Sequence, residues 1–514
     1  MTKTILVVGG GTAGWLAAAY LARYLGIAEG GPESVTPSIT LLESPEIGII
    51  GVGEGTFPTI RHTLKFLGMR EADFMRETGA TFKQGIRFTD WVEGNDEFYH
   101  PFEAPLQTEG AGLVPYWLLR GETERAPFAE AMTFQKRVIQ AMRAPKHPLE
   151  GEFDGPLNYA YHFDAVRAAQ ALARRAKELG VRHLEGTVTG VVLDDKGAID
   201  HLITREQGEV KADFYVDCTG FRAELIGQAL KAPFKSLKPV LFVDRALTCR
   251  APHPAPDAPL ESCTIATAHE AGWIWDIGLE AGRGVGCVYS SDHMDDARAE
   301  ETLRAYLGED LPLRKMSFES GYRETPWIGN CVAIGLSGGF LEPLESTGIV
   351  LIEVAVGMLA ELFPHDGRWD APAARFNQLM ARRFETIVNF LKLHYCLSRR
   401  DEPFWRDNRE AASIPESLRA LLDQWRARPP GRFDFDLDLE TFAFFNYQYI
   451  LYGMGFETDL SAARGAYPDI EGAERHFARI RAFGEGAVRD LPQHRAAIRQ
   501  FQAVSRRPVS SSSG

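Results

Sequence analysis

A lysine between apolar residues is the first candidate for chemistry in this chain. Lys83 stands in the segment Ala-Thr-Phe-Lys-Gln-Gly-Ile-Arg-Phe of residues 80–88, and the hydrophobic residues around it predict partial burial. A buried amine loses its charge more easily and so becomes a better nucleophile. The sequence alone also allows a surface lysine whose methylene stem packs against apolar side chains.

Two carboxylates stand beside a predicted helix start. Glu342 and Glu345 lie three residues apart, and Ser346, Thr347 and Gly348 open an apolar segment that runs to residue 363. The backbone N–H groups at a helix start attract a small anion. The spacing therefore predicts an anion site next to carboxylates that either do acid–base work or only cap the helix.

Aromatic residues at two places could contact a flat ring. Trp273 and Trp275 alternate in the strand-like segment 272–278, so both indoles point to one face of the strand. They could line a cavity or fill a core. His100 and Phe102 are close enough to hold a planar aromatic substrate between them, or simply to pack in a loop.

The N-terminal residues predict a dinucleotide site. An apolar strand over residues 4–8 runs into a glycine turn and a helix over residues 15–25, and a second strand over residues 38–42 ends in Glu43. The turn allows a pyrophosphate to approach the helix start, and Glu43 can accept a hydrogen bond from a ribose hydroxyl. The spaced glycines are Gly9, Gly11 and Gly14.

The remaining pattern predicts an α/β body with helical additions. A second glycine-rich loop over residues 51–58 lacks the lysine of a phosphate-binding loop and is expected close to a flat ring. Beyond residue 370 the chain is expected to be helical and aromatic. Between them we expect a helix over 164–179, strands around the turn 194–197, and strands over 214–216 and 331–336.

Composition excludes several classes of protein. The 514 residues are 45% hydrophobic, enough for one or two large domains, and the net charge of −14 argues against nucleic acid and anionic membranes. Six cysteines without CxxC spacing predict a reducing, cytoplasmic setting, and no metal site is predicted. The apolar start resembles a signal peptide only superficially, because its glycines fit the nucleotide pattern. Glu353 and Glu361 mark segment 348–363 as a buried helix rather than a membrane span.

Taken together, these blocks resemble the flavin-dependent halogenases, in the tryptophan halogenase branch. The matching motifs follow the family order from about residue 4 to residue 400. They are GGGTAGW (9–15), GVGEGT (51–56), the Lys83 segment, YHPF (99–102), VDCTGF (216–221), WIWDI (273–277) and NCVAIGLSGGFLEPLESTGI (330–349).

The resemblance implies a glutathione-reductase-like FAD-binding module with a helical module that covers the substrate. Reduced FAD and O2 would oxidise a chloride or bromide ion, bound at Thr347 and Gly348, to hypohalous acid. Lys83 would hydrogen-bond this acid or become an N-haloamine, and Glu345 would polarise the reagent or take the ring proton. The residues implied for FAD are Gly9, Gly11, Thr12, Ala13, Gly14, Glu43, Val188, Leu336 and Ile349.

The implied substrate is a small aromatic molecule. His100 and Phe102 would clamp its ring, while Trp273 and Trp275 would keep it away from the flavin. Gly278 replaces the proline that usually ends the family's tryptophan box, and residues 441–445 are too apolar for a zwitterion. We therefore expect indole or a substituted indole rather than tryptophan.

The absence of a second nucleotide motif predicts that a separate NAD(P)H-dependent flavin reductase supplies the reduced FAD; a homodimer is compatible with the resemblance. The expected modules are an FAD-binding module (1–95 and 156–370), a substrate-side insertion (96–155), a helical module (371–505) and a disordered tail (506–514). The alternatives are an aromatic monooxygenase and a non-catalytic FAD-binding protein. Both are disfavoured, because neither needs Lys83 together with Glu345.

Overall fold

The computed structural model describes residues 1–27, 36–48, 53–106, 112–436 and 440–504. Internal contacts divide the chain into two compact units, each assembled from three segments. Unit 1 comprises residues 1–80, 163–237 and 319–384, and unit 2 comprises residues 81–162, 238–318 and 385–514. The predicted modules were divided by function rather than by contacts, and their boundaries stay a prediction.

Unit 1 is built on a six-stranded sheet. Its central strands are continuous apolar runs because a parallel strand is buried on both faces, and all four of Ile5, Leu6, Val7 and Val8 are buried. All neighbours pair in parallel except the edge strand β20. The order is β20 (Trp327–Ile328), β21 (Cys331–Ala333), β12 (Phe214–Asp217), β1 (Thr4–Val8), β2 (Ser38–Glu43) and β8 (Arg182–Glu185).

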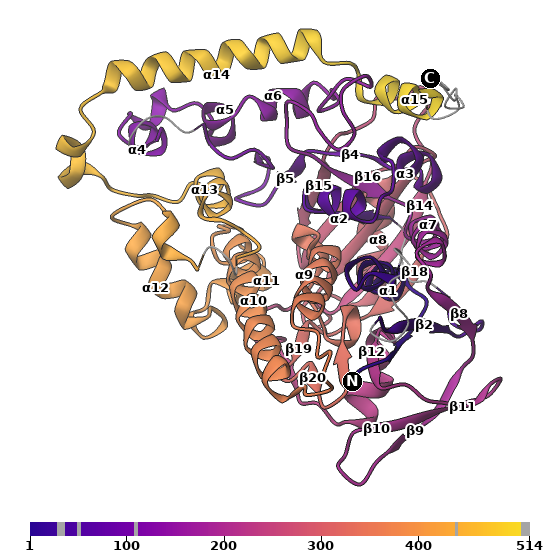
Figure 1. The fold of residues 1–514 in the computed structure, drawn as a ribbon. Helices are drawn as coiled ribbons and strands as arrows, with labels where there is room; N and C mark the ends of the chain where they lie inside the picture. Colours follow the sequence, from indigo (N-terminus) through magenta and orange to yellow (C-terminus); the bar gives the residue numbers. More distant parts are fainter. Residues whose placement is uncertain (28–35, 49–52, 107–111, 437–439, 505–514) are drawn as a thin grey trace. The chain divides into compact units, whose positions relative to one another are not determined.

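Helices α1, α7 and α9 pack together in unit 1, α1 contacting both of the others (Figure 1). Helix α7 is amphipathic, with Ala168, Ala169 and Leu172 buried, and the side chain of Asp164 caps its start by accepting from Arg167 N at 3.0 Å. The helices are α1 (Thr12–Tyr24), α2 (Ile60–Phe66), α3 (Glu71–Thr78), α7 (Ala165–Glu178), α9 (Thr347–Glu361) and the start of α10 (Asp370–Cys396).

Two small antiparallel sheets complete unit 1. The first surrounds the predicted turn at 194–197 and contains β9 (Val188–Leu193), β10 (Ile199–Thr204) and β11 (Gly208–Val210). The second contains β13 (Phe234–Ser236), β19 (Gly321–Arg323) and β22 (Gly339–Phe340). The short strand β3 (Glu54–Gly55) lies within the second glycine-rich loop.

Unit 2 is built on a seven-stranded sheet in which only β5 and β15 pair in parallel. The order is β18 (Arg314–Ser317), β14 (Arg245–Ala251), β17 (Arg283–Tyr289), β16 (Gly272–Gly278), β15 (Thr264–His269), β5 (Gly85–Thr89) and β6 (Glu97–Pro101). Strand β4 (Thr81–Lys83) pairs separately with β7 (Ala160–Phe163).

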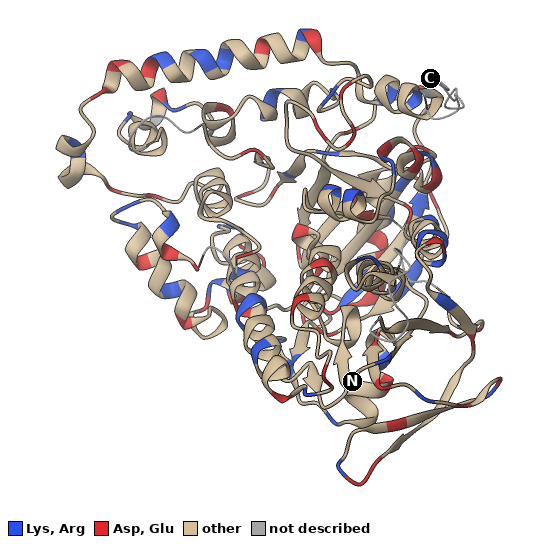
Figure 2. Cartoon of the chain, viewed as in Figure 1, with Lys and Arg blue, Asp and Glu red and all other residues tan. Residues whose placement is uncertain are grey.

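Most helices of unit 2 come from the C-terminal part of the chain. Acidic and basic residues alternate along them rather than forming a patch of one sign, as on α14 (Figure 2). No helix in the described ranges is long and apolar enough to cross a membrane. The helices are α4 (Val114–Leu118), α5 (Phe128–Met132), α6 (Gln135–Gln140), α8 (Asp296–Leu307), α11 (Pro403–Arg409), α12 (Glu416–Trp425), α13 (Phe444–Gly453), α14 (Ile470–Asp490) and α15 (His494–Val504).

The predicted elements are confirmed, with one correction. The strand expected over 331–336 ends at Ala333, and residues 335–337 form a short 3-10 turn. Gly335 takes φ +79°, where a side chain is strained, and a Cβ there would lie 2.7 Å from Ala13. The chain can turn at residue 335 because glycine has no side chain to clash with Ala13. Residues 51–52 of the second glycine-rich loop and the tail 506–514 lie outside the described residues.

Candidate active site

The first glycine turn of unit 1 has the backbone that a dinucleotide requires. Gly9 takes φ +119°, and a Cβ there would lie 2.2 Å from the carbonyl oxygen of Cys218. A Cβ on Gly14 would lie 1.8 Å from the Gly9 carbonyl, so both positions exclude a side chain. Gly11 instead precedes α1, and no side chain or distant backbone atom of the described residues lies within 4 Å of its Cβ position. Open space at an uncapped helix start fits a pyrophosphate.

Glu43 lies at this turn, as the sequence predicted. A Cβ on Gly10 would come within 2.1 Å of the Glu43 carboxyl group, so the carboxylate is held against the glycines. Its Oε2 also lies 2.9 Å from Nε2 of His183, on the neighbouring strand β8. Sequence reasoning missed His183, since nothing in its segment marks it as the partner of a residue 140 positions away.

The other residues expected to hold FAD belong to the same unit. Thr12 and Ala13 open α1, Val188 begins β9 and is half-buried, and Leu336 lies in the 3-10 turn beside Ala13. Ile349 is buried in the first turn of α9. Unit 1 therefore brings all nine predicted cofactor residues into one body, and their glycines, helix start and acidic residue fit a dinucleotide.

The motif VDCTGF contributes a structural carboxylate that sequence reasoning did not assign. Asp217 is buried at the end of β12, and its oxygens accept hydrogen bonds from the backbone of Thr219, Leu225 and Ile226 at 2.8–3.0 Å. Burial raises the pKa of Asp217, although these hydrogen bonds oppose the shift. The carboxyl group fixes the turn whose carbonyl, at Cys218, lies against Gly9.

The start of α9 has the properties of an anion site. Ser346 precedes the helix in the left-handed region, at φ 57°, and gives it no side-chain capping bond. Thr347 is fully buried, and its hydroxyl has no hydrogen-bond partner within the described ranges. Gly348 is exposed, and among the residues that the structure describes nothing lies within 4 Å of its Cβ position. Backbone strain, an uncapped helix start and open space at one turn fit a halide ion.

Both carboxylates of this segment are buried, Glu342 completely and Glu345 to 1% exposure. Glu345 ends the short 3-10 helix of residues 343–345, directly before Ser346. The carboxyl group therefore lies on the segment that leads into the predicted halide site. The Ser346 side chain does not cap α9, although capping is the ordinary role of a serine at this position.

Lys83 is the last residue of β4 in unit 2, and its burial is complete rather than partial, with 0% exposure. Its Nζ lies 5.4 Å from the centroid of the Phe102 ring. Burial lowers the pKa of the neighbouring His162 well below its usual value, and the charge of Lys83 adds to the shift. His162 is therefore neutral, with Nε2 2.8 Å from Oγ1 of Thr264.

The residues on both sides of Lys83 are fixed by hydrogen bonds. The Thr81 hydroxyl donates to the Gly278 carbonyl at 2.6 Å, and Gln84 donates through its backbone to Ser262 at 2.7 Å. Phe82 N–H donates to Nε2 of His494 at 3.0 Å, although His494 lies 412 residues away on α15. Strand β4 thus presents Lys83 from a rigid support.

Trp273 and Trp275 lie on the same face of β16, as predicted, with ring centroids 6.1 Å apart. Trp275 covers Gly286 of the adjacent strand, where a Cβ would come within 2.2 Å of the indole. Gly278, at the end of the strand, leaves room for the side chain of Leu260, because its Cβ would lie 2.8 Å from Leu260 Cδ1. Gly278 therefore accommodates a neighbour that a proline would displace.

The predicted ring clamp lies at the end of β6. His100 is buried between Phe390 and Tyr449, with ring centroids at 5.7 and 6.0 Å. Its Nε2 lies 2.9 Å from Oδ1 of Asn446 on α13, a partner that sequence reasoning did not connect with it. Phe102, beside Lys83, is half-buried. Lys83, His100 and Phe102 therefore come from one unit, Lys83 from β4 and His100 from β6, with Phe102 directly after β6.

Comparison with known proteins identifies the family of this chain. The family model described as tryptophan halogenase matches residues 4–467. This chain belongs to the tryptophan halogenase family. It is an enzyme, a flavin-dependent halogenase that uses reduced FAD, a halide and O2. The expected α/β fold, with an FAD-binding sheet and a helical region, is confirmed by the same comparison.

Three relatives illustrate the similarity. Tryptophan 6-halogenase SttH of Streptomyces toxytricini is 37% identical, over 95% of this chain and 96% of its own. The tryptophan halogenase structure from Shewanella frigidimarina has a TM-score of 0.92, with 38% identity and 98% coverage of both chains. BrvH, a flavin-dependent halogenase from Brevundimonas sp. BAL3, has a TM-score of 0.87 and 34% identity, covering 98% of this chain and 99% of its own.

Proposed function

We propose that this halogenase installs chloride or bromide on indole or a substituted indole, with Lys83 delivering the halogen. The observation that carries the proposal is the complete burial of Lys83 beside the Phe102 ring. A buried amine next to an aromatic wall is placed to meet an electron-rich ring, which a surface lysine would not be.

Bound reduced FAD supplies the activation of O2 that turns a halide into hypohalous acid. The halide binds at the backbone N–H groups of Thr347 and Gly348. Lys83 then either holds the acid by a hydrogen bond or, as a neutral amine, takes the halogen and releases water. In both cases the halogen passes to the ring carbon, and the displaced proton leaves to Glu345.

The ring is positioned by aromatic contacts. His100, fixed by Asn446, and Phe102 hold the flat face of the substrate. Trp273 and Trp275 form the wall that keeps the ring from the flavin and so suppresses hydroxylation. The related halogenases named for tryptophan suggest an indole ring, and the apolar segment 441–445, where Phe442 stacks on Phe390 at 3.9 Å, favours one without a zwitterion.

A separate NAD(P)H-dependent flavin reductase supplies the reduced flavin in this proposal, because the chain has a single G-x-G-x-x-G motif. The reducing, cytoplasmic setting also remains a proposal. It is supported by the six cysteines, all within the described residues and none in a disulfide. A homodimer stays a prediction.

A substrate panel tests the proposal. Purified enzyme, a flavin reductase, NADH and FAD are incubated with indole, tryptophan or phenol, with and without bromide, and the products are identified by mass spectrometry. We expect bromoindole as the main product, formed only with bromide. A hydroxylated product that forms equally without halide would instead establish a monooxygenase. Faster turnover of tryptophan than of indole would contradict the substrate assignment.

A further inference from the structure

His183, on the edge strand of the main sheet of unit 1, contacts the acidic residue of the dinucleotide turn. It lies on β8 opposite Leu41 of β2, and Glu43 follows Leu41 by two residues, so the side chains of His183 and Glu43 point to the same face of the sheet. The Nε2 atom of His183 lies 2.9 Å from Oε2 of Glu43. An ionised carboxylate can only accept a hydrogen bond, so Nε2 carries the proton and His183 is the donor.

The imidazole of His183 also packs against α1. Its ring lies edge-on to the indole of Trp15, with centroids 5.2 Å apart and ring planes at 60°. Trp15 is 2% exposed and stands in the first turn of α1, directly after the glycine turn. Rotation of the imidazole would break either the contact with Trp15 or the hydrogen bond to Glu43. The ring is therefore held in one orientation.

The carboxylate of Glu43 keeps acceptor capacity for a ligand. Its side chain is 30% exposed, and within the described ranges its oxygens accept one hydrogen bond, from His183 to Oε2. The other oxygen, Oε1, lies at the glycine turn, 2.1 Å from the position that a Cβ of Gly10 would take. Since a carboxylate offers about four lone pairs, Oε1 can accept from a hydroxyl group that approaches the turn.

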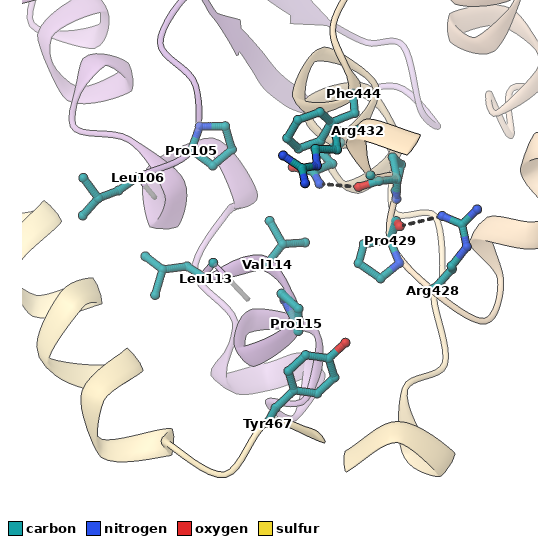
Figure 3. Close-up of a pocket in the computed structure, with 14 residues that line it drawn as sticks. Pro105, Leu106, Leu113, Val114, Pro115, Arg428, Pro429, Arg432, Phe444 and Tyr467 are labelled. Atoms are coloured by element: carbon teal, nitrogen blue, oxygen red, sulfur yellow. Dashed lines mark hydrogen bonds between the residues drawn. The ribbon is translucent and has the colours of Figure 1, made fainter. Parts of the chain in front are cut away.

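A carboxylate with a purely structural role is bonded differently. The two oxygens of Asp434 in unit 2 accept four hydrogen bonds, from Trp425, Gly431 and both terminal nitrogens of Arg428, and its side chain is 5% exposed. These bonds fix residues 428–432, which form part of the wall of a cavity of about 620 Å³ (Figure 3). The acceptor capacity of Asp434 is thus used by the protein itself, whereas that of Glu43 is not.

We propose that His183 positions Glu43 for the adenosine half of FAD. The Nε2–H group holds Oε2, and Oε1 accepts a hydrogen bond from a ribose hydroxyl. His183 is a positioning residue, because it acts on the cofactor only through Glu43. The inference rests on Glu43 as the ribose ligand, and it adds a residue of a separate strand that sets the affinity for the adenosine ribose and leaves the flavin ring unaffected.

Binding of FAD and of its two halves tests the proposal. ADP carries the adenosine ribose without the flavin, and FMN carries the flavin without the adenosine. Each is titrated into the flavin-free protein, FAD and FMN by flavin fluorescence and ADP by calorimetry. We expect His183→Ala to weaken the Kd of FAD and of ADP about fivefold, the upper range for a partly exposed pair, and to leave FMN unchanged.

Two further variants show whether the hydrogen bond is responsible. His183→Gln keeps an N–H donor for Glu43 and should recover most of the lost affinity. The matched control is His201→Ala, which removes another half-buried imidazole of unit 1, with Nδ1 2.7 Å from a carboxylate oxygen of Asp200 on β10. It should change none of the three dissociation constants. An equal loss for ADP and FMN in His183→Ala would indicate a general distortion of unit 1 and overturn the positioning role.

A double-mutant cycle with Glu43→Gln separates this inference from the assignment on which it rests. If His183 acts through Glu43, His183→Ala should weaken FAD binding about fivefold in the wild type and much less in the Glu43→Gln background. Equal effects of His183→Ala in both backgrounds would overturn the positioning role alone. An unchanged FAD Kd in Glu43→Gln would instead remove Glu43 from the ribose site. Neither outcome depends on halogenation, because binding is measured without reductase, halide or indole.

Discussion

Removal of the His494 imidazole should loosen the strand that carries Lys83. His494 is fully buried, accepts from Phe82 N–H at 3.0 Å, and through Nδ1–H donates to the Leu260 carbonyl at 3.1 Å. Burial lowers its pKa to about 4, so the ring is neutral near pH 7 and can make both bonds. The imidazole thus bridges the backbone N–H of Phe82 on β4 and the backbone carbonyl of Leu260.

The magnitude follows from the two backbone groups left behind. In His494→Ala a buried N–H and a buried C=O lose their partners, at about 1–3 kcal/mol each. A local cost of about 3 kcal/mol raises the open population of β4 roughly 100-fold. Hydrogen–deuterium exchange of a peptide spanning residues 80–84 should accelerate accordingly, while peptides of β1 in unit 1 keep their wild-type rate.

In His494→Ala, halide oxidation should continue, but less of the hypohalous acid that it forms should end up on the indole. The predicted FAD and halide residues belong to unit 1, so hypohalous acid still forms, but a displaced Lys83 captures less of it. Halogenated indole per NADH should fall, and bromination of the scavenger monochlorodimedone should rise. The control His147→Ala removes an exposed imidazole of unit 2, and His494→Gln should restore part of the coupling by replacing one bond. Exchange and coupling equal to those of His147→Ala would refute the reasoning.

Three further outcomes are expected. Gly9→Ala should abolish FAD binding, because its Cβ would lie 2.2 Å from a carbonyl oxygen, whereas Gly11→Ala should fold normally and only weaken FAD binding in a fluorescence titration. Loss of FAD affinity in neither variant would exclude this turn as the flavin site. Thr347→Val, which removes a buried hydroxyl without a described partner, should raise the KM for bromide severalfold at unchanged thermal stability; an unchanged KM would remove the hydroxyl from the halide site. Burial raises the pKa of Glu353 from 4.5 to about 7. The protonated carboxyl group therefore contributes to the free energy of unfolding below pH 4.5, and this contribution is lost as the pH rises to 7. The loss is at most about 1.4 kcal/mol per pH unit. Glu353→Gln should flatten this part of the stability–pH curve, and an unchanged curve would contradict the shift.

Local patterns predicted the elements of this fold well. The strand, glycine turn and helix at residues 4–24 follow from a continuous apolar run and from spacing that only glycines satisfy, and the structure places them as expected. The alternation of Trp273 and Trp275 likewise gave the face of β16. The strand at 331–336 was extended too far because Gly335 bends the chain against Ala13, a contact from 322 residues away.

Partnerships between distant segments could not be predicted. His183, Asn446 and His494 each bond to a predicted site residue or to its neighbour, across 140, 346 and 412 positions of sequence. A single histidine or asparagine carries no periodic or spacing signal, so only the folded chain identifies its partner. Complete burial of Lys83 was underestimated for the same reason, since its neighbour Phe102 stands in a separate segment of the chain.

The central claim, delivery of the halogen by Lys83, is tested most directly by Lys83→Met. Methionine keeps much of the length and packing of the buried side chain but has no amine. Lys146→Met is the matched control, since Lys146 is equally buried in unit 2 and bonds to the Gly151 carbonyl. With reductase, bromide and indole, Lys83→Met should bind FAD and brominate monochlorodimedone but form no bromoindole, whereas Lys146→Met should form it. Bromoindole at the wild-type rate from Lys83→Met would contradict the account.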